Sequence, residues 1–360
     1  MINSHLLSHF NNSTLSYDLE KYPFPALVLE VVKEQFPQVE TLETIHTVVD
    51  PKDLVKITKH VQKSFGSSKW SKLFDDFAEE YIKPLIDNKP YLLKRFPTLN
   101  LVVPDQTKIG RLLNFHKGTF YQNGLGQGTI WMPLTKCYES NSMWVVDYEE
   151  SCEISKHYLK LQLDQVQFEK ECLKHAWPVT LSPGEAHLFH QEHLHGNINN
   201  ETEITRLAID WHVLIKGEPF HQRLPGGFFR LPGDYVQDQL NTDTCVIYTS
   251  CNSFLDKTIP NYLQTSFIDQ WCQKNDITYS MQLSENEGAT HLPILEDVIL
   301  QGHDIVMFSI HSLPEQVSRR NYLLDLAIRT GVKLYFMNEY LLLGKDTLPK
   351  INEYLSWSTQ

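Results

Sequence analysis

The chain has 360 residues, of which 41% are hydrophobic and 21% are charged, so it can bury a core and is long enough for two domains. Its formal net charge of −12 argues against a protein whose main task is to bind nucleic-acid phosphates. No apolar run reaches the ~18 residues of a membrane span, and the N-terminus lacks a signal pattern. We therefore expect a cytoplasmic protein that does not bind membranes. The six cysteines are irregularly spaced and include no CxxC pair, which predicts reduced thiols.

Residues 1–98 are predicted to form a helical layer that packs on a later sheet. Apolar residues recur at helical spacing in three segments, and the second segment begins with a proline that is soon followed by an acidic residue, as helix starts often do. The predicted helices are Pro25–Phe36, Pro51–Phe65 and Ser68–Leu85.

Residues 99–222 change to short β-rich runs separated by turn formers such as Gly124–Gly128 and Ser182–Glu185. Several short strands without alternating helices predict a sandwich or barrel. The more polar stretch Glu149–His175 is predicted to be a partly helical insertion between strands. The predicted strands are Leu99–Val103, Arg111–Phe115, Thr129–Leu134, Ser142–Val146, Pro178–Leu181, Glu185–Phe189 and Thr205–Leu214.

Residues 223–242 are rich in proline and glycine and predict a linker. Strands and helices then alternate over residues 243–345, which predicts an open α/β domain with a mostly parallel sheet. Residues 346–360 are expected to be a C-terminal tail. The predicted strands are Cys245–Ser250, Thr278–Leu283, Asp304–Ile310 and Val332–Met337, and the predicted helices are Pro260–Asn275, His291–Gln301 and Pro314–Thr330.

Four of the sixteen histidines lie in one short predicted strand region, which is where we look for chemistry. Alternate residues of a strand share a face. His116 and Gly118 share a face in the same way farther upstream. Two histidines from separate strands that face into a small barrel predict a transition-metal pair, and imidazole suits Fe, Zn, Cu or Ni. The downstream residues predicted to share one face are His187, Phe189, Gln191, His193 and His195.

The run from His195 to Trp211 resembles the distal iron motif of phytanoyl-hydroxylase-like Fe(II)/2-oxoglutarate oxygenases. The resemblance implies that His195 is an iron ligand and that Arg206 pairs with the far carboxylate of 2-oxoglutarate. A planar guanidinium matches a carboxylate, which agrees with this role. A buried ion pair of Arg206 with Asp210 or another acidic residue is the alternative.

The stretch His116–Thr135 resembles the proximal motif of the same family and the strand that follows it. The resemblance implies that His116 is the second iron ligand, and that Thr135 and Asn197 contact the cosubstrate. It also implies an α+β fold whose core is a double-stranded β-helix of the jelly-roll or cupin-like kind.

The sequence His116-Lys117-Gly118 departs from the family pattern, which has an acidic iron ligand at the third position. Three interpretations stay open. Chloride takes the position vacated at Gly118, as in the iron halogenases; an oxygenase uses another ligand, such as Glu192, Asp147 or water; or the site is an inactive or non-oxidative relic.

The region 99–215 also resembles a subgroup of these oxygenases from bacterial surface-carbohydrate gene clusters, on Phe120–Thr135 and Asn141–Trp144. The implied function is hydroxylation or halogenation of a sugar-derived or other small polar metabolite, with Fe(II), 2-oxoglutarate and in the second case chloride. The alternative is a non-enzymatic or non-oxidative metal-binding barrel or scaffold protein of a carbohydrate cluster. The predicted substrate-pocket residues are Tyr121, Asn123, Trp131, Glu192 and Trp211.

The C-terminal domain resembles the catalytic domain of serine recombinases and, more closely, a small stand-alone α/β protein of the same carbohydrate clusters. Acidic residues outnumber basic ones after residue 243, which argues against DNA as a partner. Ser250, Ser309 and Glu339 are predicted near the carboxyl ends of strands, where open α/β sheets bind ligands. An interaction module that forms a homo-oligomer, a second catalytic site and a sugar-nucleotide binder stay open for this domain.

Overall fold

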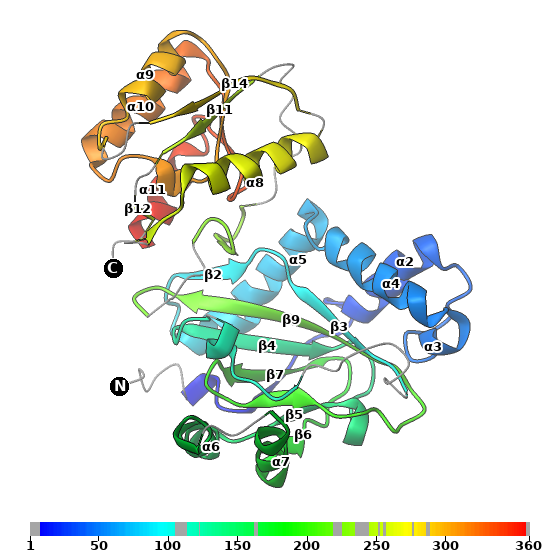
Figure 1. The fold of residues 1–360 in the computed structure, drawn as a ribbon. Helices are drawn as coiled ribbons and strands as arrows, with labels where there is room; N and C mark the ends of the chain where they lie inside the picture. Colours follow the sequence, from blue (N-terminus) through cyan, green and yellow to red (C-terminus); the bar gives the residue numbers. More distant parts are fainter. Residues whose placement is uncertain are drawn as a thin grey trace. The chain divides into compact units, whose positions relative to one another are not determined.

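The structure is a computed structural model that describes residues 8–104, 114–121, 123–161, 165–218, 225–234, 245–250, 253–254, 257–275, 277–285 and 289–357. The chain divides into two compact units, Met1–Arg223 and Leu224–Gln360, called unit 1 and unit 2 below. Helices and sheets occur in both units, which agrees with the predicted mixture of the two (Figure 1).

Unit 1 contains a large antiparallel sheet whose longest strand is β9 (Arg206–Ile215). β4 (Gln127–Pro133) pairs with one side of β9, and two shorter strands pair one after the other with its opposite side. The shorter strands are β2 (Tyr91–Lys94) and β3 (Thr98–Val102). Beyond β4 the sheet continues with β7 (Glu185–His190) and β1 (Ser13–Ser16). The prediction of a helical layer for residues 1–98 therefore missed β1 and β2, which are too short to show a strand pattern.

The helices of residues 1–98 cover one face of this sheet, and their buried side chains form one core with it (Figure 1). The third predicted helix is shorter than expected, because the chain leaves the α-helix after Phe77 and Pro84 lacks the N–H that a helix interior needs. The helical segments are α2 (Phe24–Gln35), α3 (Ile45–Val48), α4 (Pro51–Ser64), α5 (Ser68–Phe77), the π-helical turn η1 (Ala78–Ile82) and the 3-10 turn η2 (Lys83–Ile86).

The alternation of side chains along β9 separates this core from a polar interior. Leu207, Ile209 and Trp211 belong to the core shared with the helices. The Trp211 ring lies between Phe74 and Phe77, at centroid distances of 5.1 and 5.7 Å. The even-numbered residues of the strand therefore point to the opposite face.

A smaller antiparallel sheet of unit 1 consists of β6 (Trp177–Pro178), β5 (Met143–Val145) and β8 (His195–Asn197). The predicted insertion forms two helices, α6 (Tyr148–Leu161) and α7 (Gln165–His175), which lie beside this sheet (Figure 1). Their apolar residues pack on the loop before His116 and on the residues flanking β5 and β8. Most of the predicted strand Arg111–Phe115 lies outside the described residues. Unit 1 also contains two short 3-10 turns, η4 (Gly118–Tyr121) and η5 (Glu139–Asn141).

Unit 2 is built on a sheet in the order β14-β11-β15-β16-β17, which is parallel except for the last strand. β14 comes after β11 in the chain but forms the edge of the sheet, and β11 lies between β14 and β15. The sheet strands are β11 (Cys245–Thr249), β14 (Tyr279–Ser284), β15 (Ile305–Met307), β16 (Leu334–Phe336) and β17 (Leu341–Leu342). The other elements are β10 (Phe229–Arg230), β12 (Ser253–Phe254), β13 (Lys257–Thr258), α8 (Asn261–Lys274), α9 (Pro293–Leu300), η6 (Ile310–Ser312), α10 (Val317–Thr330) and α11 (Leu348–Trp357).

Parts of the predicted linker and of the predicted C-terminal tail are folded into unit 2. Tyr354, on α11, is fully buried, accepts a hydrogen bond from the backbone N–H of Leu231 at 2.8 Å and donates one to the carboxylate of Asp234. The prediction of a tail for residues 346–360 is therefore wrong for α11, and the prediction of a linker is wrong for residues 225–234. Their fixed contacts come from residues distant in sequence, which local composition does not reveal.

Two general expectations concern cysteines and membranes. The cysteines in the described ranges are free, as the sequence predicts, and all but Cys152 are buried. No helix in those ranges combines the length and apolarity that a membrane crossing requires.

The position of Trp211 predicts a large stability effect. We expect Trp211→Ala to lower the free energy of unfolding by about 3–5 kcal/mol, because the substitution leaves a cavity between the sheet and α5. Urea denaturation followed by circular dichroism measures this change. Trp177→Ala serves as the matched control, since Trp177 is 36% exposed and its removal should cost much less. Equal losses for the two variants would contradict the assignment of Trp211 to the core.

Candidate metal and cosubstrate site

His116 and His195 lie directly opposite each other in a short antiparallel pairing. The backbone N–H of His116 donates to the carbonyl of His195 at 2.9 Å, and the N–H of His195 donates to the carbonyl of His116 at 3.0 Å. Residues paired in this way point to the same side. Their imidazole centroids are accordingly 4.3 Å apart, which brings the two predicted metal ligands together.

Both imidazoles are held in the tautomer that a metal site requires. Nδ1 of His116 lies 2.8 Å from the carbonyl oxygen of Asn114, and Nδ1 of His195 lies 3.0 Å from that of His193. A carbonyl oxygen only accepts, so each Nδ1 carries the proton and each Nε2 keeps its lone pair. Burial lowers the pKa of His116, and it lowers the pKa of His195 to about 3, so both rings are neutral at physiological pH.

Gly196 has a steric reason to follow His195. A Cβ at this position would lie 2.7 Å from the backbone nitrogen of Phe115 and 2.8 Å from its Cα, closer than real Cβ contacts. The loop that carries His116 therefore lies against β8 at backbone distance. The N–H of Phe115 donates to Glu169 of α7 at 3.0 Å, so the insertion helices help to fix this loop.

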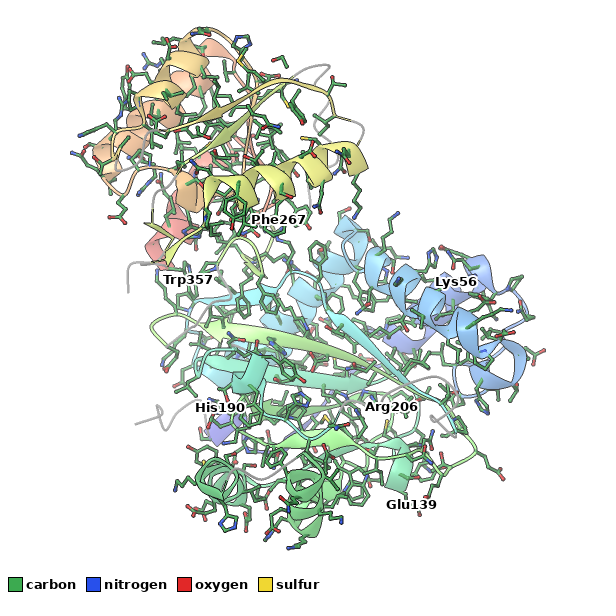
Figure 2. The ribbon with its side chains drawn as sticks, viewed as in Figure 1. Lys56, Glu139, His190, Arg206, Phe267 and Trp357 are labelled. Carbon is green, nitrogen blue, oxygen red and sulfur yellow. The ribbon has the colours of Figure 1, made fainter. Side chains whose placement is uncertain are left out.

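A cavity of about 320 Å³ lies in front of the two histidines. Side chains from both sheets of unit 1 line it, and Figure 2 shows the Arg206 side chain between the sheets. Most of the lining residues have polar side chains. The lining residues besides His116 and His195 are Lys94, Thr98, Asn100, Gly118, Tyr121, Asn123, Thr129, Trp131, Met143, Gln191, Gly196, Asn197, Arg206, Asp210 and His212.

Arg206 is a buried cation at this cavity, with 1% of its surface exposed. Its Nε donates to the carbonyl of Asn141 at 3.2 Å, its Nη2 donates to the Asn197 side-chain oxygen, and the guanidinium lies 5.6 Å from the Trp131 ring centroid. Among the described residues, no carboxylate forms an ion pair with it. Burial lowers the pKa of Arg206 to about 10, so the group remains charged at neutral pH. A buried charge without a counter-charge is costly, which makes this position suited to an anionic ligand.

Asp210 does not pair with Arg206, contrary to the alternative interpretation of the sequence. Its carboxylate lies 3.2 Å from Nζ of Lys94 and 3.3 Å from Nε2 of His212. Burial pushes the pKa of Asp210 upward, but Lys94 and His212 outweigh burial and the pKa is lowered overall. Lys94 also donates to Thr98 at 2.7 Å. These side chains form a charged, hydrogen-bonded wall of the cavity, called the Lys94 wall below.

The space that Gly118 opens is filled. A Cβ at this position would lie 1.8 Å from Oε1 of Gln191 and 3.1 Å from Nδ2 of Asn123. The expectation of chloride beside Gly118 therefore has no support in the geometry. Tyr121 and Asn123 do line the cavity, and the Tyr121 ring packs edge-on against His116 at 4.9 Å.

Four predicted site residues lie elsewhere. The Glu192 carboxylate accepts from Lys117 at 3.0 Å and from Thr119 at 2.6 Å and does not line the cavity. The predicted cosubstrate contact Thr135 accepts from the N–H of Leu207 at 3.0 Å. Trp211 faces the helices, because its odd position on β9 places it opposite Arg206. Asp147, the other suggested iron ligand, accepts from Asn12 at 3.0 Å.

The residues from His187 to His195 do not share one face throughout, contrary to the prediction. Strand β7 ends at His190 and a turn follows, so the alternation is lost before His193. Nε2 of His187 lies 3.3 Å from Oδ1 of Asn12, and Nε2 of His193 lies 3.0 Å from Oδ1 of Asn11. Of the five residues in the predicted set, Gln191 and His195 line the cavity.

Sequence reasoning missed Lys94 and His212 as cavity residues, and it named Gln191 only as a member of the predicted common face. The alternation from Arg206 along β9 places His212 on the same face and was a usable signal. Strand alternation gave Gln191 its predicted face, but a turn after β7 positions it, and Lys94 carried no local signal because a short, unpredicted strand positions it.

The candidate residues of unit 2 are used within the fold. Ser309 donates to the Glu339 carboxylate at 2.6 Å, and the N–H of Ile310 donates to its other oxygen at 2.9 Å. Ser250 donates to the carbonyl of Ser312 at 3.0 Å. These groups stabilise the carboxyl ends of the strands.

No family model and no curated protein sequence matches this chain. Similar solved structures, all at low identity, include non-heme enzymes, among them proteins described as alpha-ketoglutarate-dependent or as holding 2-oxoglutarate. One is the non-heme monooxygenase ThoJ in a nickel complex, with 12% identity, TM-score 0.39 and coverage of 74% of this chain and 94% of that chain. Another is EctD from S. alaskensis with 2-oxoglutarate and 5-hydroxyectoine, with 10% identity, TM-score 0.36 and coverage of 59% and 75%. A third is the alpha-ketoglutarate-dependent epimerase SnoN from nogalamycin biosynthesis, with 11% identity, TM-score 0.35 and coverage of 59% and 82%. Likeness at these TM-scores does not define the reaction of this chain.

The buried His187 predicts a loss of stability in acid. Burial lowers its folded-state pKa to about 3, whereas an unfolded histidine titrates near 6.5. Below pH 6.5 the unfolded chain takes up a proton that the folded chain does not, so the free energy of unfolding falls as pH falls. We expect a contribution of up to about 1.4 kcal/mol per pH unit from this group.

The measurement is the free energy of unfolding from pH 7.5 to 4.5 for the natural chain and for His187→Gln. The glutamine amide can still donate to Asn12 but does not titrate, so its profile should be flatter. Parallel profiles would contradict the assignment.

Proposed function

We propose that unit 1 is an Fe(II)/2-oxoglutarate-dependent oxygenase of a sugar-derived or other small polar metabolite, built on a double-stranded β-helix core. The observation that carries the proposal is the combination in one cavity of two neutral, paired imidazoles and a buried arginine. The two sheets of unit 1, with the histidines on the smaller one, support the fold assignment.

The donor set fits a divalent iron. Neutral imidazole nitrogens are common ligands of Fe(II), and each Nδ1–H is bound to a backbone carbonyl, as is usual for metal-bound histidines. His116 and His195 would hold the metal through Nε2. In the described part of the chain, no third histidine, cysteine, aspartate or glutamate completes a group that could hold a metal ion.

The arginine fits a dicarboxylic cosubstrate. Nε and Nη2 of Arg206 are used by Asn141 and Asn197, whereas Nη1 makes no hydrogen bond with the described residues. Arg206 would bind the far carboxylate of 2-oxoglutarate, which supplies the missing counter-charge. Asn197 and Trp131 position the guanidinium, and the ring of Trp131 shields it from water.

When bound, iron and 2-oxoglutarate supply the oxidation of a substrate C–H bond with O₂. The chain itself orients the reactants and limits access of water. The Lys94 wall offers a carboxylate, an ammonium and a hydroxyl, groups that pair with the hydroxyls of a sugar-like molecule. A hydroxylation fits better than a halogenation, because Gln191 fills the space beside Gly118.

We also propose that unit 2 is an interaction module through which the chain forms a homo-oligomer. In support, its candidate catalytic groups are engaged in hydrogen bonds within the fold, and Tyr262 and Phe267 of α8 are 72% and 48% exposed. Light scattering of the full chain should give a mass above that of one chain, and Tyr262→Glu should reduce it. A monomer at micromolar concentration would contradict this assignment.

Arg206 provides the sharpest test of the oxygenase proposal. Arg206→Gln should weaken 2-oxoglutarate binding by tenfold or more, since a hydrogen bond to a charged group contributes about 1.5–3 kcal/mol. Anaerobic calorimetry with Fe(II)-loaded protein measures the affinity, and succinate formation measures turnover. Arg319→Gln, in an ion pair of unit 2, is the matched control and should change neither quantity. Absence of metal binding, or equal affinity in natural chain and Arg206→Gln, would overturn the proposal.

A further inference from the structure

Gln191 occupies the place from which an acidic ligand would reach the metal. An aspartate at position 118 would project its carboxylate from a Cβ that lies 1.8 Å from Oε1 and 2.8 Å from Cδ of Gln191. The carboxamide of Gln191 therefore fills the volume of the carboxylate that Gly118 lacks. Gln191 is 1% exposed and lines the cavity together with His116 and His195.

Two hydrogen bonds fix the orientation of this carboxamide. Nε2 donates to the Thr129 hydroxyl at 2.6 Å, and Oε1 accepts from Nδ2 of Asn123 at 2.8 Å. The nitrogen is thus directed to β4 and the oxygen toward Gly118. An amide oxygen has two lone pairs, so one remains for a further partner.

Asn123 gives an independent indication that a ligand belongs here. Its side chain is 8% exposed, and its Oδ1 is buried without a hydrogen-bond partner among the described residues. A buried acceptor in this state is costly. A hydrogen-bond donor, such as a water brought in with a metal, would satisfy it.

We propose that Oε1 of Gln191 is the third protein ligand of the metal, in place of the family's carboxylate. This inference rests on the proposed function, because it assigns the third ligand of the same site. The nearby acidic side chains are already paired with other groups: Glu192 with Lys117, and Asp210 with Lys94 and His212. A neutral amide leaves the metal with one negative charge fewer than a carboxylate does, and its bulk excludes a halide.

Co(II) is the probe for the test, because its visible spectrum reports ligand changes and its affinity is measurable without turnover. Gln191→Ala should weaken Co(II) binding by about tenfold or more, since even residues beyond the ligand shell change metal affinity by about 10- to 100-fold. Gln191→Glu should strengthen it, because a carboxylate adds charge and still accepts from Asn123. Glu192→Gln is the control from the same turn and should leave affinity unchanged.

A double substitution separates ligation from folding. Gly118→Asp alone should weaken Co(II) binding, because its side chain collides with Gln191. Gly118→Asp combined with Gln191→Ala should restore binding, since the new carboxylate then has room. Thermal melts of each variant establish that it is folded.

The outcomes distinguish the two proposals. Co(II) binding that is lost in His116→Ala but unchanged in Gln191→Ala and Gln191→Glu would overturn the role of Gln191 and leave the oxygenase proposal standing. No Co(II) binding by the natural chain would overturn both.

Discussion

The reciprocal backbone hydrogen bonds between His116 and His195 are the constraint on which the site depends. They make two residues 79 positions apart in sequence direct neighbours, and they set both imidazoles on one side. Side-chain packing alone would leave each ring several rotamers, whereas the backbone pairing and the Nδ1 bonds to Asn114 and His193 leave one arrangement. Gly196 permits this pairing at close range, and α7 supports it through Glu169. The insertion thus supports the histidine pair, although none of its described residues lines the cavity.

Strand β9 connects this small sheet to the rest of unit 1. Its odd positions, such as Trp211, anchor the sheet on the N-terminal helices, and its even positions place Arg206, Asp210 and His212 in the cavity. One strand therefore carries both the core and the polar wall, with a period of two separating them. The bond from Arg206 to Asn197 joins β9 to β8, so the predicted cosubstrate contact and the histidine pair are mechanically linked.

The sequence was informative where a pattern is local. The strands around Trp131 and Arg206, the helices α8, α9 and α10 of unit 2 and the two histidines followed from alternation, helical periodicity and motif resemblance. It was uninformative where contacts are distant. The tail that became α11 is ordered by Tyr354 reaching Leu231, and Gln191 reaches Gly118 only because a turn follows β7. Assigning Trp211 to the pocket failed for a reason present in the sequence, since its parity with Arg206 already placed it on the other face.

The cavity combines features that cost stability in the free protein. Among the residues that the structure describes, no carboxylate pairs with the buried Arg206 and no donor reaches the Asn123 side-chain oxygen. Two neutral imidazoles also lie side by side at the cavity. Each is unfavourable unless a ligand of matching chemistry is present. A divalent cation satisfies the imidazoles and an amide oxygen, and a dicarboxylate satisfies the guanidinium. Ligands of this chemistry that bound only the folded chain would stabilise it by mass action. The fold therefore holds these polar groups in positions that are energetically unfavourable without a bound ligand, and this is the physical reason to regard the cavity as a binding site.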